Sequence, residues 1–144
     1  MTVLKTLETE TLSSFCTLDE LAGSMIKSFG PLAARNKSVI LNDIPDHLYI
    51  DTDPDIIAAV LSGLLSAVIR NAKESCIRLS AKIYTNVILV HIKDYNSLNF
   101  CPIENSLQQL QPMAEKVGGS VSVTSQRHNV ATFAFSFPNL PMAA

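Results

Sequence analysis

Several features that define common protein classes are missing from this 144-residue sequence. Its three cysteines form no CxxC pair and no cluster with histidine, which argues against a zinc site and favours reduced thiols. Its longest apolar run, residues 56–69, is too short to span a bilayer, and its first residues lack the apolar core of a signal peptide. The net charge of −2 provides no basic excess for nucleic acid. We therefore expect a cytoplasmic protein that neither enters a membrane nor binds nucleic acid.

Glycine is missing where a nucleotide-binding loop would need it. Residues 91–126 contain an apolar strand ending at Asp94, a polar loop, an amphipathic helix and a Gly-Gly turn, the order that usually surrounds a nucleotide phosphate. Glycine-rich loops let backbone N–H groups reach a phosphate, but no glycine occurs between Asp94 and Gly118. The segment therefore predicts either a nucleotide site or the shell of one that no longer works.

The residues that are present predict one well-buried globular domain. Hydrophobic residues make up 47% of the chain and charged residues 17%, which is typical of a folded protein with a sizeable core. We assign residues 17–138 to this domain. Residues 1–16 are expected to form an N-terminal arm or a helix stub, and residues 139–144 a tail.

Helical periodicity marks three segments. The first follows Thr17, whose spacing to a glutamate predicts a capping box, and the pair Gly30-Pro31 is expected to kink or break it. The second follows Asp53, which precedes a proline at the first helical position. The third is predicted over residues 106–119.

Strand patterns occupy the intervals between these helices. They lie at residues 38–44, 48–51, 76–84, 87–94, 120–126 and 131–137. Residues 87–94 are apolar on both faces, which predicts a central strand. Hairpins thus alternate with helices, so we predict an α+β two-layer sandwich, with a mixed, largely antiparallel sheet and all three helices on one face.

Four of these stretches, taken in order, resemble the ATPase domain of sensor histidine kinases, which belongs to the superfamily shared with gyrase, heat-shock protein 90 and mismatch-repair ATPases. They are residues 31–70, 77–94, 110–125 and 131–138. The resemblance covers nearly all of the predicted domain. It implies the two-layer fold, ATP with magnesium as the ligand, and a protein partner in a signalling pathway.

The resemblance also implies two asparagines on the second helix that hold the magnesium ion. The corresponding positions here are Gly63 and Ala67, which offer no oxygen ligand. Asn71 lies four residues after Ala67 on the same helix face and is a displaced candidate. The alternative is a solvated asparagine near the end of a helix.

At the adenine end, the resemblance implies that Asp94 reads the adenine amino group and that Thr132 supports it from the closing strand. The alternative is that both residues merely occupy strand positions. Two glycines that follow the aspartate in the family are replaced here by Asn96 and Leu98. Asn96 can adopt a left-handed turn, whereas Leu98 is a poor substitute. Residues 95–106 form a short connection where the family has a longer, glycine-rich lid.

The shortened connection carries an apolar tip at Phe100, Cys101 and Pro102. These residues either cover the core where a nucleotide would sit or contact a partner. Both interpretations remain open.

Together these departures predict a degenerate domain that acts as a non-catalytic signalling or scaffold module in a two-component-type pathway. Its partner would be a sensor kinase or a response regulator. No catalytic residue, metal ligand or cofactor is expected, and ATP and magnesium would bind only if the pocket is functional. Two alternatives stay open: the ATP-binding catalytic domain of a sensor histidine kinase with atypical motifs, and part of a histidine phosphotransfer protein.

Overall fold

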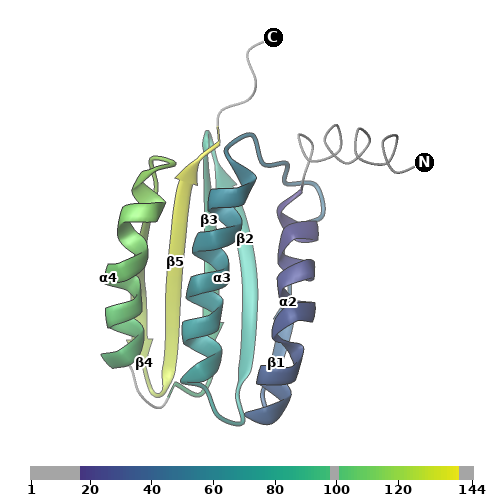
Figure 1. The fold of residues 1–144 in the computed structure, drawn as a ribbon, viewed down its shortest axis with the longest axis vertical. Helices are drawn as coiled ribbons and strands as arrows, with labels where there is room; N and C mark the ends of the chain where they lie inside the picture. Colours follow the sequence, from purple (N-terminus) through teal and green to yellow (C-terminus); the bar gives the residue numbers. More distant parts are fainter. Residues whose placement is uncertain (1–16, 98–100, 140–144) are drawn as a thin grey trace, which may run out of the picture.

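The computed structural model describes residues 17–97 and 101–139. The expected arm, 1–16, and most of the expected tail lie outside these ranges. The described residues form three helices and one five-stranded sheet (Figure 1). The helices are α2 (Leu18–Arg35), α3 (Pro54–Arg70) and α4 (Cys101–Glu115), and the strands are β1 (Val39–Asn42), β2 (Cys76–Tyr84), β3 (Val87–Asp94), β4 (Ser120–Arg127) and β5 (Val130–Pro138).

The sheet is mixed and largely antiparallel, with the strand order β1-β2-β3-β5-β4. Only the pairing of β1 with β2 is parallel among these strands; the other neighbours run antiparallel. All three helices cover the same face, with α2 near β1, α3 over the middle and α4 near β4 (Figure 1). The predicted two-layer α+β sandwich is confirmed.

Strand alternation builds the core. Every second residue of the central strands points toward the helices, as expected for a pleated strand. On β3 and β5 these residues are completely buried or nearly so: Ile88, Val90, Ile92, Phe133, Phe135 and Phe137. The helix layer is therefore packed against an aliphatic and aromatic surface in the middle of the sheet.

The start of α2 follows the sequence prediction. Thr17 Oγ1 accepts a hydrogen bond from Glu20 N at 3.2 Å and donates one to the Glu20 carboxylate at 2.7 Å. Of the kink or break predicted at Gly30-Pro31, the break is wrong, because α2 continues through Pro31 to Arg35, and the kink stays a prediction. Pro31 lies on the exposed side of the helix, where a carbonyl without its usual donor can bond to water.

The strand predicted at residues 48–51 is also wrong. Tyr49 makes only an isolated bridge with Thr17. The side chain of Asn139 takes up the neighbouring backbone groups: its Oδ1 accepts from Asp51 N at 2.7 Å, and its Nδ2 donates to the Tyr49 carbonyl at 2.9 Å. The apolar alternation in this segment arises because Leu48 and Ile50 are buried in the core.

The third helix begins at Cys101, earlier than the predicted residue 106, and ends at Glu115. A turn with Gly118 at a φ of 74° follows, and Gly119 N donates to the Ala114 carbonyl at 2.9 Å. No helix within the described ranges combines the length and the hydropathy that a membrane crossing requires.

Gly119 is required for close approach between this turn and β5. A Cβ at this position would lie 2.2 Å from the Ser136 carbonyl oxygen, whereas a Cβ at Gly23 would have nothing within 4 Å. We expect Gly119→Ala to lower the free energy of unfolding by about 1–3 kcal/mol, and Gly23→Ala to raise it by up to about 1 kcal/mol. Urea unfolding of both variants measures this difference. Equal effects of the two substitutions would contradict the close approach.

Candidate nucleotide-binding region

Asp94 is a buried carboxylate at the end of β3. It continues the inward-facing series of that strand and is 0% exposed, between Ile77 on β2 and Ala131 on β5. Its Oδ1 accepts hydrogen bonds from Ser75 Oγ at 2.5 Å and from Asn96 N at 3.0 Å. Its Oδ2 has no hydrogen-bond partner among the described residues. One oxygen of a deeply buried carboxylate therefore lacks a donor among the described residues.

The environment of Asp94 disfavours its charge. Desolvation by burial raises the pKa of Asp94 above its ordinary value, and the hydrogen bonds from Ser75 and Asn96 oppose this effect only in part. A ligand that donated an N–H to Oδ2 would stabilise the ionised carboxylate. The amino group of adenine has the chemistry required.

Sequence reasoning missed Ser75, although a signal existed. The tight turn at Thr85-Asn86 sets the pairing of β2 with β3, in which Ile77 lies opposite Asp94. Counting back along that register places Ser75 beside the end of β3.

The structure does not bring Thr132 to Asp94. Thr132 is paired with Lys93, and its side chain lines a hollow on the face of the sheet away from the helices. The β5 residue paired with Asp94 is Ala131, which has no polar side chain. The alternation of β5 explains the difference, because Thr132 precedes the inward-facing Phe133.

The first candidate position for magnesium is filled by α4. A Cβ at Gly63 would lie 2.6 Å from Cδ2 of Leu110, so the α4 side chain occupies the space next to the α3 backbone. The second position, Ala67, is 8% exposed. Neither residue supplies an oxygen ligand, and at Gly63 a larger side chain would first have to displace Leu110.

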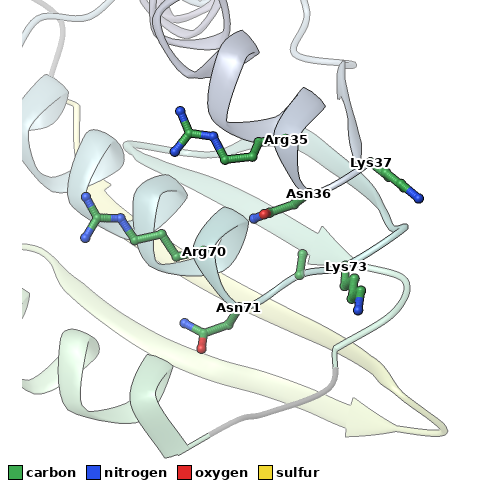
Figure 2. A pocket seen from close by; sticks show the side chains of 7 residues that line it. Arg35, Asn36, Lys37, Arg70, Asn71 and Lys73 are labelled. Carbon is green, nitrogen blue, oxygen red and sulfur yellow. The ribbon is translucent and has the colours of Figure 1, made fainter.

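Asn71 caps the end of α3. Its Nδ2 donates to the Ala67 carbonyl at 2.8 Å. It lines a cavity of about 350 Å³ between the C-terminal ends of α2 and α3, toward which Asn36 is directed (Figure 2). The charged side chains lining this cavity are all cationic: Arg35, Lys37, Arg70 and Lys73. Such a surrounding does not suit a divalent cation.

Hydrogen bonds to two different segments hold the first residues of the connection after β3. Ser97 N donates to the Asn129 carbonyl at 2.6 Å, and Asn96 Nδ2 donates to the Lys73 carbonyl at 2.7 Å. Asn96 has no positive φ, so the predicted left-handed turn is not used. Because α4 already begins at Cys101, only residues 95–100 join it to β3. This connection is even shorter than the sequence indicated.

The predicted apolar tip falls largely outside what the structure describes. Leu98 and Phe100 lie outside the described residues. Cys101 and Pro102 form the start of α4, and their side chains are also outside the description. The proposed role of the tip stays a prediction.

The raised pKa of Asp94 has a consequence for stability. The folded chain retains this proton to higher pH than the unfolded chain, so stability falls as the pH rises from the ordinary value of 3.8 through the folded value. We expect Asp94→Asn to remove this contribution and to flatten the pH dependence of the free energy of unfolding above about pH 4. Urea unfolding across pH measures it, with Asp46→Asn, an exposed carboxylate, as the control. Parallel curves for wild type and Asp94→Asn would contradict the burial effect.

The contact between Gly63 and Leu110 predicts energetic coupling. Gly63→Asn should lower the free energy of unfolding by about 1–3 kcal/mol because the new side chain meets Leu110. In a Leu110→Ala background the same substitution should be less harmful, with a coupling energy of about 1 kcal/mol. A double-mutant cycle measured by urea unfolding gives this value. Gly23→Asn is the matched control, and additive effects at Gly63 and Leu110 would rule out the contact.

No family model and no curated protein matches this sequence. The structure is similar to histidine kinase AdeS of Acinetobacter baumannii, with a TM-score of 0.73 and 14% identity over 87% of this chain and 66% of that one. It matches the nucleotide-free catalytic domain of histidine kinase ThkA, with a TM-score of 0.72 and 18% identity over 88% of this chain and 96% of that one. It also matches ThkA in complex with response regulator protein TrrA, with a TM-score of 0.69 and 15% identity over 96% of this chain and 48% of that one.

It also matches full-length ShkA in complex with AMPPNP, with a TM-score of 0.73 and 15% identity over 90% of this chain and 32% of ShkA. The chain therefore spans less than two thirds of AdeS, of ThkA in its complex and of ShkA. The described residues have the fold of the catalytic domain of histidine kinases.

Proposed function

We propose that this chain is a histidine-kinase-like domain that does not transfer phosphate and serves as a signalling or scaffold module in a two-component-type pathway of the cytoplasm. The observation that carries the proposal is the packing of Leu110 against Gly63, where the resemblance places a magnesium ligand. Residues 17–138 are the proposed functional unit.

The chemistry of phosphoryl transfer supports this proposal. Such transfer depends on positioning and on neutralising charge with metal ions and backbone donors. Here the two positions for metal-binding asparagines are Gly63 and Ala67, and the connection that would cover the phosphates is reduced to residues 95–100. Loss of even one preorganised donor lowers rates by about 10²–10³. Several such losses together leave no effective catalyst.

The adenine end is the part that fits a ligand. Asp94 has a buried oxygen without a partner among the described residues, which suits an amino donor. The β5 residue paired with Asp94 is Ala131, so β5 places no polar side chain directly beside this carboxylate. We expect any residual nucleotide binding to be weak and independent of magnesium.

A signalling protein is the proposed partner, either a response regulator or a sensor kinase. ThkA, which shares the fold, forms a complex with the response regulator protein TrrA. A domain that has lost its metal positions but keeps a well-packed core can retain such an interface, because protein recognition does not require the phosphate site.

A catalytic ATP-binding domain with atypical motifs is the second candidate. ShkA shows that the fold can hold AMPPNP, and the open oxygen of Asp94 is compatible with an adenine. In this candidate Asn71 would have to supply an oxygen ligand from a cavity lined by cations. Magnesium dependence separates the two candidates.

Calorimetric titration with ATP, with and without magnesium, tests the proposal. We expect no heat up to millimolar ATP, or weak binding that magnesium does not change and that Asp94→Asn abolishes. Asp46→Asn, which alters an exposed carboxylate, is the matched control. Micromolar binding that magnesium tightens would overturn the proposal and favour the catalytic domain.

A further inference from the structure

The sheet face opposite the helices carries a cationic hollow. On β2 the outward residues include Arg78, Ser80 and Lys82, and on β3 they include His91 and Lys93. With Tyr95, Thr124 and Thr132, these residues line a hollow of about 400 Å³. The three described helices all lie on the other face of the sheet (Figure 1).

Two cations in this hollow are directly opposite each other. Arg78 pairs with Lys93 across β2 and β3, and Ser80 pairs with His91. Like charges in directly opposed strand positions destabilise a sheet. Burial is the largest cause of the lowered pKa of His91, and the nearby charges of Lys82 and Lys93 lower it further. Asp43 offsets the charge of Arg78, so Lys82 and Lys93 are the cations left for an anionic ligand.

Carboxylates are scarce around these cations. None of the residues that line the hollow is acidic. Asp43, at the edge, forms an ion pair with Arg78. Lys82 and Lys93 have no ion pair among the described residues, and the Lys93 ammonium lies 5.6 Å from the centre of the Tyr95 ring. At least two cations remain available to a ligand.

An apolar strip adjoins the hollow. Val39 and Leu41 of β1 are 58% and 47% exposed, and Leu41 is paired with Arg78. Paired residues of neighbouring strands share a face of the sheet, so this strip and the cations form one surface. We call it the open face, defined by Val39, Leu41, Arg78, Lys82, His91 and Lys93.

We propose that the open face binds an acidic amphipathic segment of a partner protein. The pair Arg78/Lys93 and the residue Lys82 are separated by four residues along β2, which is roughly 13 Å at about 3.3 Å per residue. Carboxylates two turns apart on a helix are separated by roughly 11 Å. Such a helix can reach both cationic positions while its apolar side covers Val39 and Leu41.

Protein is favoured over nucleic acid as the occupant by charge and by shape. The chain has a net charge of −2, whereas nucleic-acid affinity depends on neutralising many phosphates. The exposed apolar strip has no counterpart on a phosphate backbone. An acidic amphipathic helix supplies complements to both parts of the surface.

This inference names the binding surface for the proposed signalling function and rests on that function for the choice of a protein partner. The surface is separate from Asp94, which faces the helix layer. Nucleotide titration therefore tests the proposed function without testing the open face. Peptide binding tests the open face without depending on the nucleotide site.

The test is fluorescence anisotropy with a labelled helical peptide of leucine and glutamate in heptads, and a second peptide with glutamine in place of glutamate. We expect the acidic peptide to bind, and Lys82→Gln/Lys93→Gln to weaken binding about tenfold. The matched control is Lys27→Gln/Lys116→Gln, which removes two exposed lysines elsewhere and should leave binding within about twofold. Amide chemical-shift changes should map to β1, β2 and β3.

Several outcomes would overturn this proposal. They are equal weakening by both double variants, equal binding of the glutamine peptide, or shift changes confined to the helix layer. Tighter binding of a single-stranded oligonucleotide would assign the face to nucleic acid. Self-association in sedimentation that Lys82→Gln/Lys93→Gln abolishes would assign it to a second copy of the chain.

Discussion

The alternation of the central strands is the constraint on which the rest of this structure depends. Successive side chains of a strand point to opposite faces, so one face of the sheet receives the largest apolar residues of β3 and β5. The other face receives their polar residues together with Val87, Leu89 and Ala134. Asp94 occupies the next position in the inward series Ile88, Val90, Ile92. Its burial, and therefore its raised pKa, follows from its place in that series. The same rule turns Thr132 and the basic residues toward the open face.

The contact between α3 and α4 and the short connection after β3 are neighbouring features of the candidate nucleotide-binding region. The absence of a side chain at Gly63 lets Leu110 approach the α3 backbone, which brings α4 against α3. Residues 95–100 join Asp94 to the first turn of α4. We therefore expect that an asparagine restored at position 63 alone would meet Leu110 as a steric obstacle.

Much of the architecture could be predicted because its signals are local and periodic. The helix starting at Pro54, the hairpin of β2 and β3 and the burial of β5 all follow from caps and alternation. The errors occurred where distant residues decide. Residues 48–51 alternate like a strand, but their backbone groups are satisfied by the side chain of Asn139, which no local pattern reveals. Gly63 was identified as unable to bind a metal, but its contact with Leu110 depends on how two helices pack.

The two faces of the sheet offer different possibilities for recognition. The face of the sheet under the helices is filled by packed side chains. Near Asp94, the group left for recognition is one carboxylate oxygen without a hydrogen-bond partner among the described residues. The open face instead keeps like charges opposed across β2 and β3 in a chain whose net charge is negative. Solvent screens the repulsion between these cations when the face is free. An anionic partner would stabilise the cations more strongly than solvent does, because binding excludes that solvent. The open face can therefore serve as a recognition surface while Gly63 stays packed against Leu110 on the other side of the sheet.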